Sequence, residues 1–541
     1  MKVLLAYLCD YDDRDDYYLS LLPYGITSMA AWLEKKGFDI TLANFSREGH
    51  RGALAYIEKE KPHVVGLSIF SFNRTESLKL IKKIKERHHN IKIIAGGPHA
   101  TFLAREIIDR YPQIDHIIQG EAEHAIAGLL DDMENGRSAE KIISGQRITD
   151  LDSLPYPSAF AGRSMGINHN EQYKFIVTSR GCPSNCTFCS SPSFWSRRTA
   201  FRSPENIFNE IVHIHRKYGV IYFSIRDDNF TMKKDRVMKL TRMIRESGLY
   251  IMWNCQARVD TIDEDMLREM KLAGLEHIQY GVESGSESVL ARYNKDISID
   301  DIVNAAGATR KAGVYLSIYL MTGMLGETGA DVKKTIQLIK KILPGDGIVS
   351  PVAYYPGTAM YEEMKAKGLV SDDIWFKSHE SGIFVRNDPA VHEWMNRLLN
   401  ELGKIRRHSW YREKDFREHR SYMGEDCWVT DMLEGDFYLH EEKLSEAEQC
   451  YARVTEKYPR NVWGHLRMGK VHFFKEEFTV SEKYFRTAAE IVPAYYGAWL
   501  KQAEALLVQG KRGEARSAAE RAFSLNRYDA RIRNVKNLLH H

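Results

Sequence analysis

The chain has 541 residues, of which 43% are hydrophobic and 28% are charged. This balance is typical of a globular protein with several packed cores, and at about 100–200 residues per domain the length predicts three or four domains. The formal net charge is only +3, so the composition does not favour nucleic acid or an anionic membrane as a partner. The sequence contains no apolar run long enough for a membrane-spanning helix. Seven cysteines are too few for a disulfide-stabilised secreted scaffold, and we expect a cytoplasmic protein.

Residues 1–150 alternate short apolar runs with helical patterns, which predicts a Rossmann-like parallel sheet with helices on both faces. The expected strands are Lys2–Leu8, Asp39–Ala43, Val64–Ile69, Ile91–Ala95 and His116–Ile118. Sheets of this kind bind ligands in the crevice at the carboxyl ends of their strands. The turns that follow these strands are therefore the expected binding positions.

A linker is predicted at 151–169, because Pro155 and Pro157 both resist helix. Residues 170–385 then repeat the alternation of strand and helix. The expected strands are Tyr173–Ser179, Ile221–Arg226, Ile251–Arg258, His277–Gly281, Tyr315–Thr322 and Ile348–Tyr354. Six such units predict a partly closed barrel with its site at the carboxyl ends of the strands.

The C-terminal region is helical in pattern and has an internal period. Gly435, Gly469 and Ala503 are each 34 residues apart, and Pro459 and Pro493 follow the same step. This pattern resembles tetratricopeptide repeats, which we expect over residues 434–541, after a helical connector at 386–433. An irregular helical tail is the alternative interpretation.

The sharpest motif is Cys182-x3-Cys186-x2-Cys189, directly after the first expected barrel strand. Three thiolates on one short loop can converge on one metal centre. Structural zinc normally takes four ligands, whereas a four-iron cluster held by three cysteines leaves one iron open to bind another group. Structural zinc, with His169 as the nearest further ligand, and three unrelated thiols remain as alternatives.

This cysteine triplet, placed after the first barrel strand, resembles that of the radical S-adenosylmethionine (SAM) superfamily. The resemblance implies a partial (β/α)6 TIM barrel, a [4Fe-4S] cluster on Cys182, Cys186 and Cys189, and cleavage of SAM to a 5′-deoxyadenosyl radical. Many relatives have a Gly-Gly-Glu turn after the second strand, where this chain has two aspartates. A helix-capping turn and an ordinary salt bridge are the alternative roles for Asp228 and Arg258. The SAM-binding residues that the resemblance implies are Phe188, Asp227, Asp228, Arg258, Glu283 and Gly323.

The glycine-rich turns of residues 1–150 contain neither Gly-x-Gly-x-x-Gly nor a P-loop, which disfavours a dinucleotide or ATP. In their order, and in their fusion to the cysteine motif, they resemble the cobalamin-binding domain of one large class of radical SAM enzymes. The loop Cys9–Leu22 has no histidine, so the resemblance implies cobalamin without histidine ligation of cobalt. A degenerate sheet that no longer binds cobalamin is the alternative. The cobalamin-binding residues implied are Pro23, Tyr24, Gly25, Ser68, Gly96, Gly97, His99, Gly120 and Glu121.

Taken together, these resemblances imply a cobalamin-dependent radical SAM methyltransferase that acts on an unactivated carbon or phosphorus centre of a small-molecule or carrier-bound substrate. A non-methylating oxidation, cyclisation or rearrangement is one alternative, and a tetratricopeptide assembly protein with a vestigial barrel is another. The implied partners are an electron donor such as flavodoxin or ferredoxin and a protein bound by the repeats, with no nucleic acid and no transmembrane segment.

Overall fold

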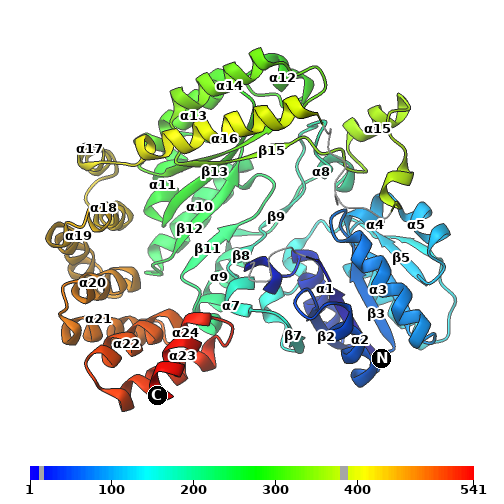
Figure 1. Ribbon diagram of the computed structural model, residues 1–541, viewed down its shortest axis with the longest axis horizontal. Helices are drawn as coiled ribbons and strands as arrows, with labels where there is room; N and C mark the ends of the chain where they lie inside the picture. The colour runs from blue at the N-terminus through cyan, green and yellow to red at the C-terminus, as the bar shows by residue number, and fades with distance from the viewer. Residues whose placement is uncertain (11–16, 378–387, 541) are drawn as a thin grey trace.

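The computed structural model describes residues 1–10, 17–377 and 388–540. Two α/β units lie side by side, and a helical array runs along the far side of the second unit (Figure 1). No helix among the described residues is long and apolar enough to cross a membrane.

Within the described residues, seven parallel strands form the first sheet in the order β6-β5-β4-β3-β1-β2-β7. The strands are β1 Lys2–Tyr7, β2 Asp39–Asn44, β3 Val64–Ser68, β4 Lys92–Gly96, β5 His116–Gln119, β6 Ile142–Ser144 and β7 Arg163–Met165. The helices are α1 Tyr24–Lys35, α2 Gly49–Glu60, α3 Arg74–Arg87, α4 Pro98–Phe102, α5 Ala104–Arg110 and α6 Glu123–Glu134, with short 3-10 turns at Tyr17–Ser20, Leu151–Ser153 and Pro157–Ala159.

Both faces of this sheet are buried, as the apolar strands predict. Val3 and Leu5 pack in one core with residues of α1 and α6, and Leu4 and Ala6 pack in another with residues of α2, α3 and α5. The strand order reverses at β1, which lies between β2 and β3. This reversal opens a crevice at the carboxyl ends of the strands, where such sheets bind ligands.

The five strands expected in the first unit are confirmed, but the sheet has two further strands that the sequence analysis left unassigned. One of them, β7, lies inside the predicted linker 151–169 and pairs in parallel with β2 through Thr41 and Arg163. Strands of three residues are too short to give a periodic signal. The segment between the two α/β units is therefore partly built into the first sheet.

The described residues of the second unit form a six-stranded parallel sheet in the order β15-β14-β13-β12-β11-β8. Its strands are β8 Phe175–Ile176, β11 Tyr222–Ile225, β12 Met252–Ala257, β13 Leu275–Glu283, β14 Tyr315–Thr322 and β15 Asp346–Pro351. The helices are α7 His169–Gln172, α8 Ser191–Phe194, α9 Pro204–Tyr218, α10 Lys234–Glu246, α11 Glu264–Leu272, α12 Glu287–Arg292, α13 Ile299–Lys311, α14 Gly329–Ile342, α15 Ala359–Ala366 and α16 Pro389–Ser409, with 3-10 turns at Phe230–Met232, Val259–Thr261 and Asp372–Trp375. Because β8 and β15 are the two ends of the sheet, the barrel is partial, as predicted.

The first barrel strand is shorter than the expected Tyr173–Ser179. Asp227 accepts hydrogen bonds from the backbone N–H groups of Thr178 and Ser179, which removes these donors from a strand ladder. The chain then forms a separate antiparallel pair, β9 Ser179–Arg180 with β10 Ala200–Phe201. This break turns the chain toward the first unit and starts the cysteine loop.

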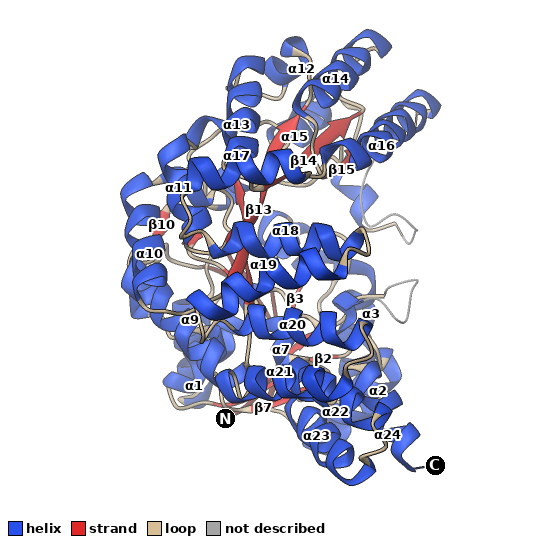
Figure 2. Ribbon diagram, turned by 90° about the vertical axis from the view of Figure 1, so that its left-hand side faces the viewer, coloured by secondary structure: helices blue, strands red, loops and turns tan. Residues whose placement is uncertain are grey.

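After α17 Glu413–Met423, helices α18 to α24 stack in succession down one side of the molecule (Figure 2). They are α18 Trp428–His440, α19 Leu444–Lys457, α20 Val462–Phe474, α21 Phe478–Ile491, α22 Tyr496–Val508, α23 Arg512–Leu525 and α24 Ala530–His540. Within residues 428–525 the first helix of each pair starts 34 residues after the previous one, which matches the sequence period. The assignment of these pairs to tetratricopeptide repeats stays a prediction.

The small residues of the 34-residue period lie where paired helices touch, so enlarging one is expected to destabilise the array. A Cβ atom at Gly469 would lie 2.6 Å from the ring of Phe485. We expect Gly469→Val to lower the free energy of unfolding by about 1–3 kcal/mol, the usual cost of overpacking, as measured by urea denaturation. Gly403→Val is the control, because a Cβ at Gly403 in α16 meets no atom within 4 Å. Equal stability of both variants would contradict this packing.

Candidate active site

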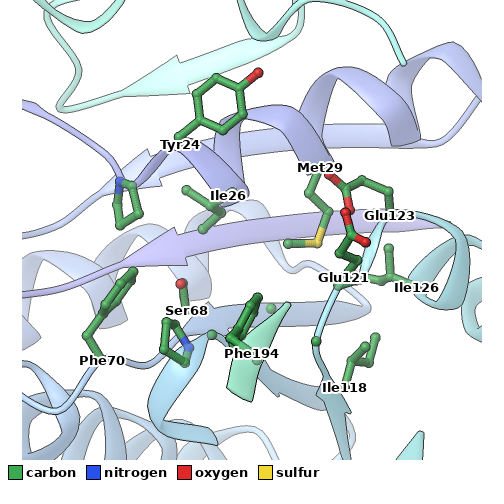
Figure 3. A pocket seen from close by; sticks show the side chains of 18 of the residues that line it. Tyr24, Ile26, Met29, Ser68, Phe70, Ile118, Glu121, Glu123, Ile126 and Phe194 are labelled. Atoms are coloured by element: carbon green, nitrogen blue, oxygen red, sulfur yellow. The ribbon is translucent and has the colours of Figure 1, made fainter. Parts of the chain in front are cut away.

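A cavity of about 340 Å³ lies between the two α/β units (Figure 3). Its floor is backbone and small side chains at the carboxyl ends of β3 and β4, and its walls include the start of α1. The second unit closes it with Val177, Arg180, Gly181, Phe194, Trp195, Arg226 and Asp228. The predicted crevice of the first sheet thus opens directly onto the barrel.

Most of the predicted cobalamin-binding residues line this cavity: Pro23, Tyr24, Gly25, Ser68, Gly96, Gly97, Gly120 and Glu121. Gly97 has a φ of 94°, and a Cβ there would lie 2.7 Å from the carbonyl oxygen of Ile69, so this position requires glycine. A Cβ at Gly25 would meet no atom within 4 Å. The cavity is mostly apolar, and its glycines allow a ligand to contact the backbone directly. Both properties fit a large planar macrocycle such as a corrin.

His99, which was predicted as a cobalamin contact, is not among the residues that line the cavity. Its side chain is buried, its Nδ1 lies 3.0 Å from the Ser71 hydroxyl, and its ring packs edge-on against Trp375. Burial and the nearby charge of Arg74 lower the pKa of His99 to about 3, so the imidazole is neutral. Helix α4 starts at Pro98, and His99 on its first turn packs behind the cavity wall.

The three cysteines of the predicted cluster lie on one loop after β9, and neighbouring segments hold this loop. Tyr293 accepts a hydrogen bond from the N–H of Thr187 (2.9 Å), and the Asn294 amide donates to the carbonyl of Asn185 (2.8 Å). At the start of the loop, Gly181 has a φ of 92°, and a Cβ there would lie 2.2 Å from the Arg198 carbonyl oxygen. The contacts with Tyr293 and Asn294 join the middle of the loop to the segment that follows α12.

The thiols of Cys182, Cys186 and Cys189 lie close enough to affect one another electrostatically. Burial raises the pKa of the Cys186 thiol, and burial also raises the pKa of Cys189 to about 12, with a further contribution from Asp228. Among the described residues, no three His, Cys, Asp or Glu side chains are grouped to hold a single metal ion. A [4Fe-4S] cluster binds its thiolate ligands through separate irons, and three thiols on one loop supply donors of the type that such a cluster takes.

The two aspartates after β11 have different environments. Asp227 is fully buried, and its oxygens accept hydrogen bonds from Thr178, Ser179 and Arg236. Its carboxylate therefore orders the turn that precedes the cysteine loop and is not available to a cofactor. Asp228 lines the cavity, accepts a hydrogen bond from the Ser191 hydroxyl (2.5 Å), and has its pKa raised by burial.

The other predicted SAM-binding residues surround the cysteine loop from the strands that follow. Phe188 packs edge-to-face on Tyr293 with ring centroids 5.2 Å apart. The buried Glu283 carboxylate lies 2.7 Å from the ammonium of Lys295, and its φ of 64° is unusual for a residue other than glycine. Arg258 pairs with Asp260 at 2.7 Å. Gly323 donates its N–H to the carboxylate of Glu327 (2.6 Å).

Sequence reasoning missed several residues of this region. Lys295 acts electrostatically on the Cys186 thiol, but it lies in a loop and belongs to no motif. Arg226, Phe194 and Trp195 line the cavity from the second unit. Arg226 directly follows β11 and directly precedes the two aspartates, which is the one signal that could have pointed to it.

Comparison with known proteins agrees with this geometry. The family model "Radical SAM superfamily" matches residues 176–339, and the model "B12 binding domain" matches residues 15–130. The chain therefore contains a radical SAM domain and a B12-binding domain. The radical SAM domain implies a [4Fe-4S] cluster and SAM, and the B12-binding domain implies cobalamin.

Two curated relatives and one solved structure show how similar this chain is to known proteins in sequence and in fold. An uncharacterized methyltransferase of Pyrococcus horikoshii is 28% identical over 342 residues, covering 59% of this chain and 73% of the relative. The anaerobic magnesium-protoporphyrin IX monomethyl ester cyclase of Rubrivivax gelatinosus is 24% identical over 341 residues, covering 58% of this chain and 60% of the relative. The methyltransferase TsrM of Kitasatospora setae, solved with cobalamin and a [4Fe-4S] cluster, shares the fold with a TM-score of 0.57 and 15% identity, covering 68% of this chain and 78% of TsrM.

Proposed function

We propose that this radical SAM enzyme is a cobalamin-dependent methyltransferase that acts on an unactivated carbon or phosphorus centre of a small-molecule or carrier-bound substrate. One observation carries the proposal. A single cavity is lined on one side by the strand ends of the B12-binding domain and on the other by Arg180 and Gly181, which directly precede Cys182. A molecule in this cavity would contact both cofactor sites.

When bound, the cluster supplies the electron that cleaves SAM to a carbon radical, and cobalamin supplies the methyl group; such chemistry belongs to the cofactors. The residues of the chain bind and orient these groups. We assign Cys182, Cys186 and Cys189 to the cluster. Asp228 would accept hydrogen bonds from the amino group of SAM, and Glu283 from its ribose hydroxyls. Phe188 and the turn at Gly323 would contact its adenine, and Arg258 would bind its carboxylate.

The names of the relatives favour methylation. The relative from Pyrococcus horikoshii and the structurally similar TsrM are both named methyltransferases. The relative from Rubrivivax gelatinosus is named a cyclase, which corresponds to a non-methylating outcome. Product analysis separates the two, because methylation forms S-adenosylhomocysteine and adds one labelled carbon to the product.

We expect the anaerobically reconstituted enzyme to form S-adenosylhomocysteine only when hydroxocobalamin is present. With methyl-labelled SAM, a reductant and a deproteinised metabolite extract as the substrate source, label should also enter an extract component. Mass spectrometry and scintillation counting measure both products. Formation of 5′-deoxyadenosine alone, with an altered but unlabelled product, would favour the non-methylating alternative.

We also infer four chain segments: a cobalamin-binding domain at 1–150, a barrel at 170–385 after the linker, a connector at 386–433 and repeats at 434–541. The reductant would be a cytoplasmic flavodoxin or ferredoxin, and the repeats would bind a partner protein.

Trp428, Tyr451 and Val454 of the array share a core with the barrel, so deleting the array would expose barrel surface. Substitutions at Lys470 and the exposed Phe474 are therefore the better test of partner binding.

A further inference from the structure

The turn between β5 and α6 and the strand β9 are joined by a group of buried charges. Glu121 and Glu123 come from the B12-binding domain, Arg147 follows β6 at the end of that domain, and Arg180 comes from β9 of the barrel unit. We call these four residues the interdomain ion cluster. The side chains of Arg180, Glu121 and Glu123 are 8%, 4% and 6% exposed.

The guanidinium of Arg180 bridges the two glutamates. Its Nη1 lies 2.8 Å from Glu121 Oε1, and its Nη2 lies 2.5 Å from Glu123 Oε1. Although burial alone would raise the pKa of Glu123, the charge and hydrogen bonds of Arg180 hold it below the usual value. The charges of this group balance, and each is hydrogen-bonded, which is the condition under which buried ions persist in a protein.

The second oxygen of Glu121 is also occupied. It lies 2.8 Å from Nη1 of Arg147 and accepts the N–H of Ile148 at 2.8 Å. Arg147 in turn donates to the carbonyl oxygen of Arg180 at 2.9 Å. Glu121, predicted as a cobalamin contact, thus contacts the barrel unit through its carboxylate, and it also lies in the cavity wall (Figure 3).

The ion cluster connects the cavity to the cysteine loop by a short path. Arg180 and Gly181 line the cavity, and Cys182 follows them directly. The guanidinium of Arg147 lies over the ring of Trp195, 4.8 Å from its centroid, and a Cβ at Gly181 would lie 2.9 Å from Trp195. Any movement of the B12-binding domain relative to the barrel would thus pull on the first residues of the loop.

We propose that the interdomain ion cluster is a positioning device that sets the place of cobalamin relative to the iron–sulfur cluster. The proposal rests on the proposed function, since it requires both cofactors at the assigned sites. Arg180 acts as a positioning residue. Its planar guanidinium can donate hydrogen bonds to two carboxylates at once in a fixed geometry, whereas the ammonium group of lysine cannot fix this geometry. Positioning of this kind governs the reaction rate, because displacing a reacting group by about 1 Å can lower the rate on the order of 100-fold.

The test compares Arg180→Lys with the wild-type enzyme, both reconstituted with iron, sulfide and hydroxocobalamin. We expect iron content, the affinity for hydroxocobalamin and uncoupled cleavage of SAM to 5′-deoxyadenosine to stay within about threefold. Pulsed electron paramagnetic resonance measures the strength of the magnetic interaction between the reduced cluster and cob(II)alamin. We expect the distribution of this interaction strength to broaden in the variant. Formation of S-adenosylhomocysteine should fall by roughly 10- to 100-fold.

Arg420→Lys is the matched control, because Arg420 of α17 likewise bridges two carboxylates, Asp431 and Glu434 of α18, far from the cavity in the chain. It should change none of these measurements. Glu123→Gln serves as the second variant if Arg180→Lys does not fold, and the same broadening is expected. An unchanged magnetic interaction, or parallel loss of iron, cobalamin affinity and activity, would overturn the proposal. A wild-type protein that binds no cobalamin would instead refute the proposed function.

Discussion

Cys186→Ala is expected to abolish the iron–sulfur cluster and, with it, the cleavage of SAM. Cys186 is the most buried of the three loop thiols and lies between the other two in sequence. With two thiolates remaining, the loop lacks the third bond that holds a site-differentiated [4Fe-4S] cluster. The iron and sulfide content, the visible absorption of the cluster and the yield of 5′-deoxyadenosine should all fall to background.

Cys255→Ala is the matched control for this experiment. Cys255 is fully buried in β12 of the same barrel but does not belong to the loop, and its removal costs only a small apolar group. This variant should keep its iron and its SAM cleavage. If Cys186→Ala retained a complete cluster, or if Cys255→Ala lost it, the assignment of the loop cysteines would be refuted.

The second large effect is expected for Gly25→Trp, which should weaken cobalamin binding while leaving the iron–sulfur cluster intact. Gly25 lies in the first turn of α1 and lines the cavity, and no atom lies within 4 Å of a Cβ built there. An indole at this position would occupy cavity volume without straining the backbone. A steric cost of about 3 kcal/mol corresponds to an affinity loss of roughly 100-fold, which equilibrium dialysis with hydroxocobalamin would measure.

Gly128→Trp provides the control for the cavity-filling variant. Gly128 lies on α6 of the same domain and is exposed, and a Cβ added there would also meet no atom within 4 Å. It does not line the cavity. We expect wild-type affinity for hydroxocobalamin in Gly128→Trp. Equal binding by both tryptophan variants would mean that cobalamin occupies another part of the molecule.

Features that depend on neighbouring residues could be predicted from the sequence. Cys182, Cys186 and Cys189 are close together in the sequence, so a single short loop carries all three and the motif can be recognised without knowing the fold. The strand–helix alternation predicted both α/β units, because the burial of a strand or a helix face appears as a local period. The 34-residue step likewise matched the starts of α18, α20 and α22, since each helix pair repeats the same packing.

Predictions about individual side chains were less secure, because their partners are distant in sequence. Glycines such as Gly25 and Gly97 reached the cavity as expected, since a turn after a strand must lie at its carboxyl end. The ring of His99 instead packs against Trp375, a residue far along the chain. The carboxylate of Asp227 accepts hydrogen bonds from the backbone N–H groups of Thr178 and Ser179. No local sequence pattern indicates these hydrogen bonds.

By itself, the sequence determined the cysteine loop, the order of the two α/β units and the repeat, because each depends on short-range spacing and on which residues avoid water. Only the tertiary structure decided that Arg180 meets Glu123, 57 residues away, and that Glu121 contacts the barrel unit. Charges of opposite sign are common along the chain, and burial between two packed units selects which of them pair. The same packing decides where the cavity lies and which side chains face it.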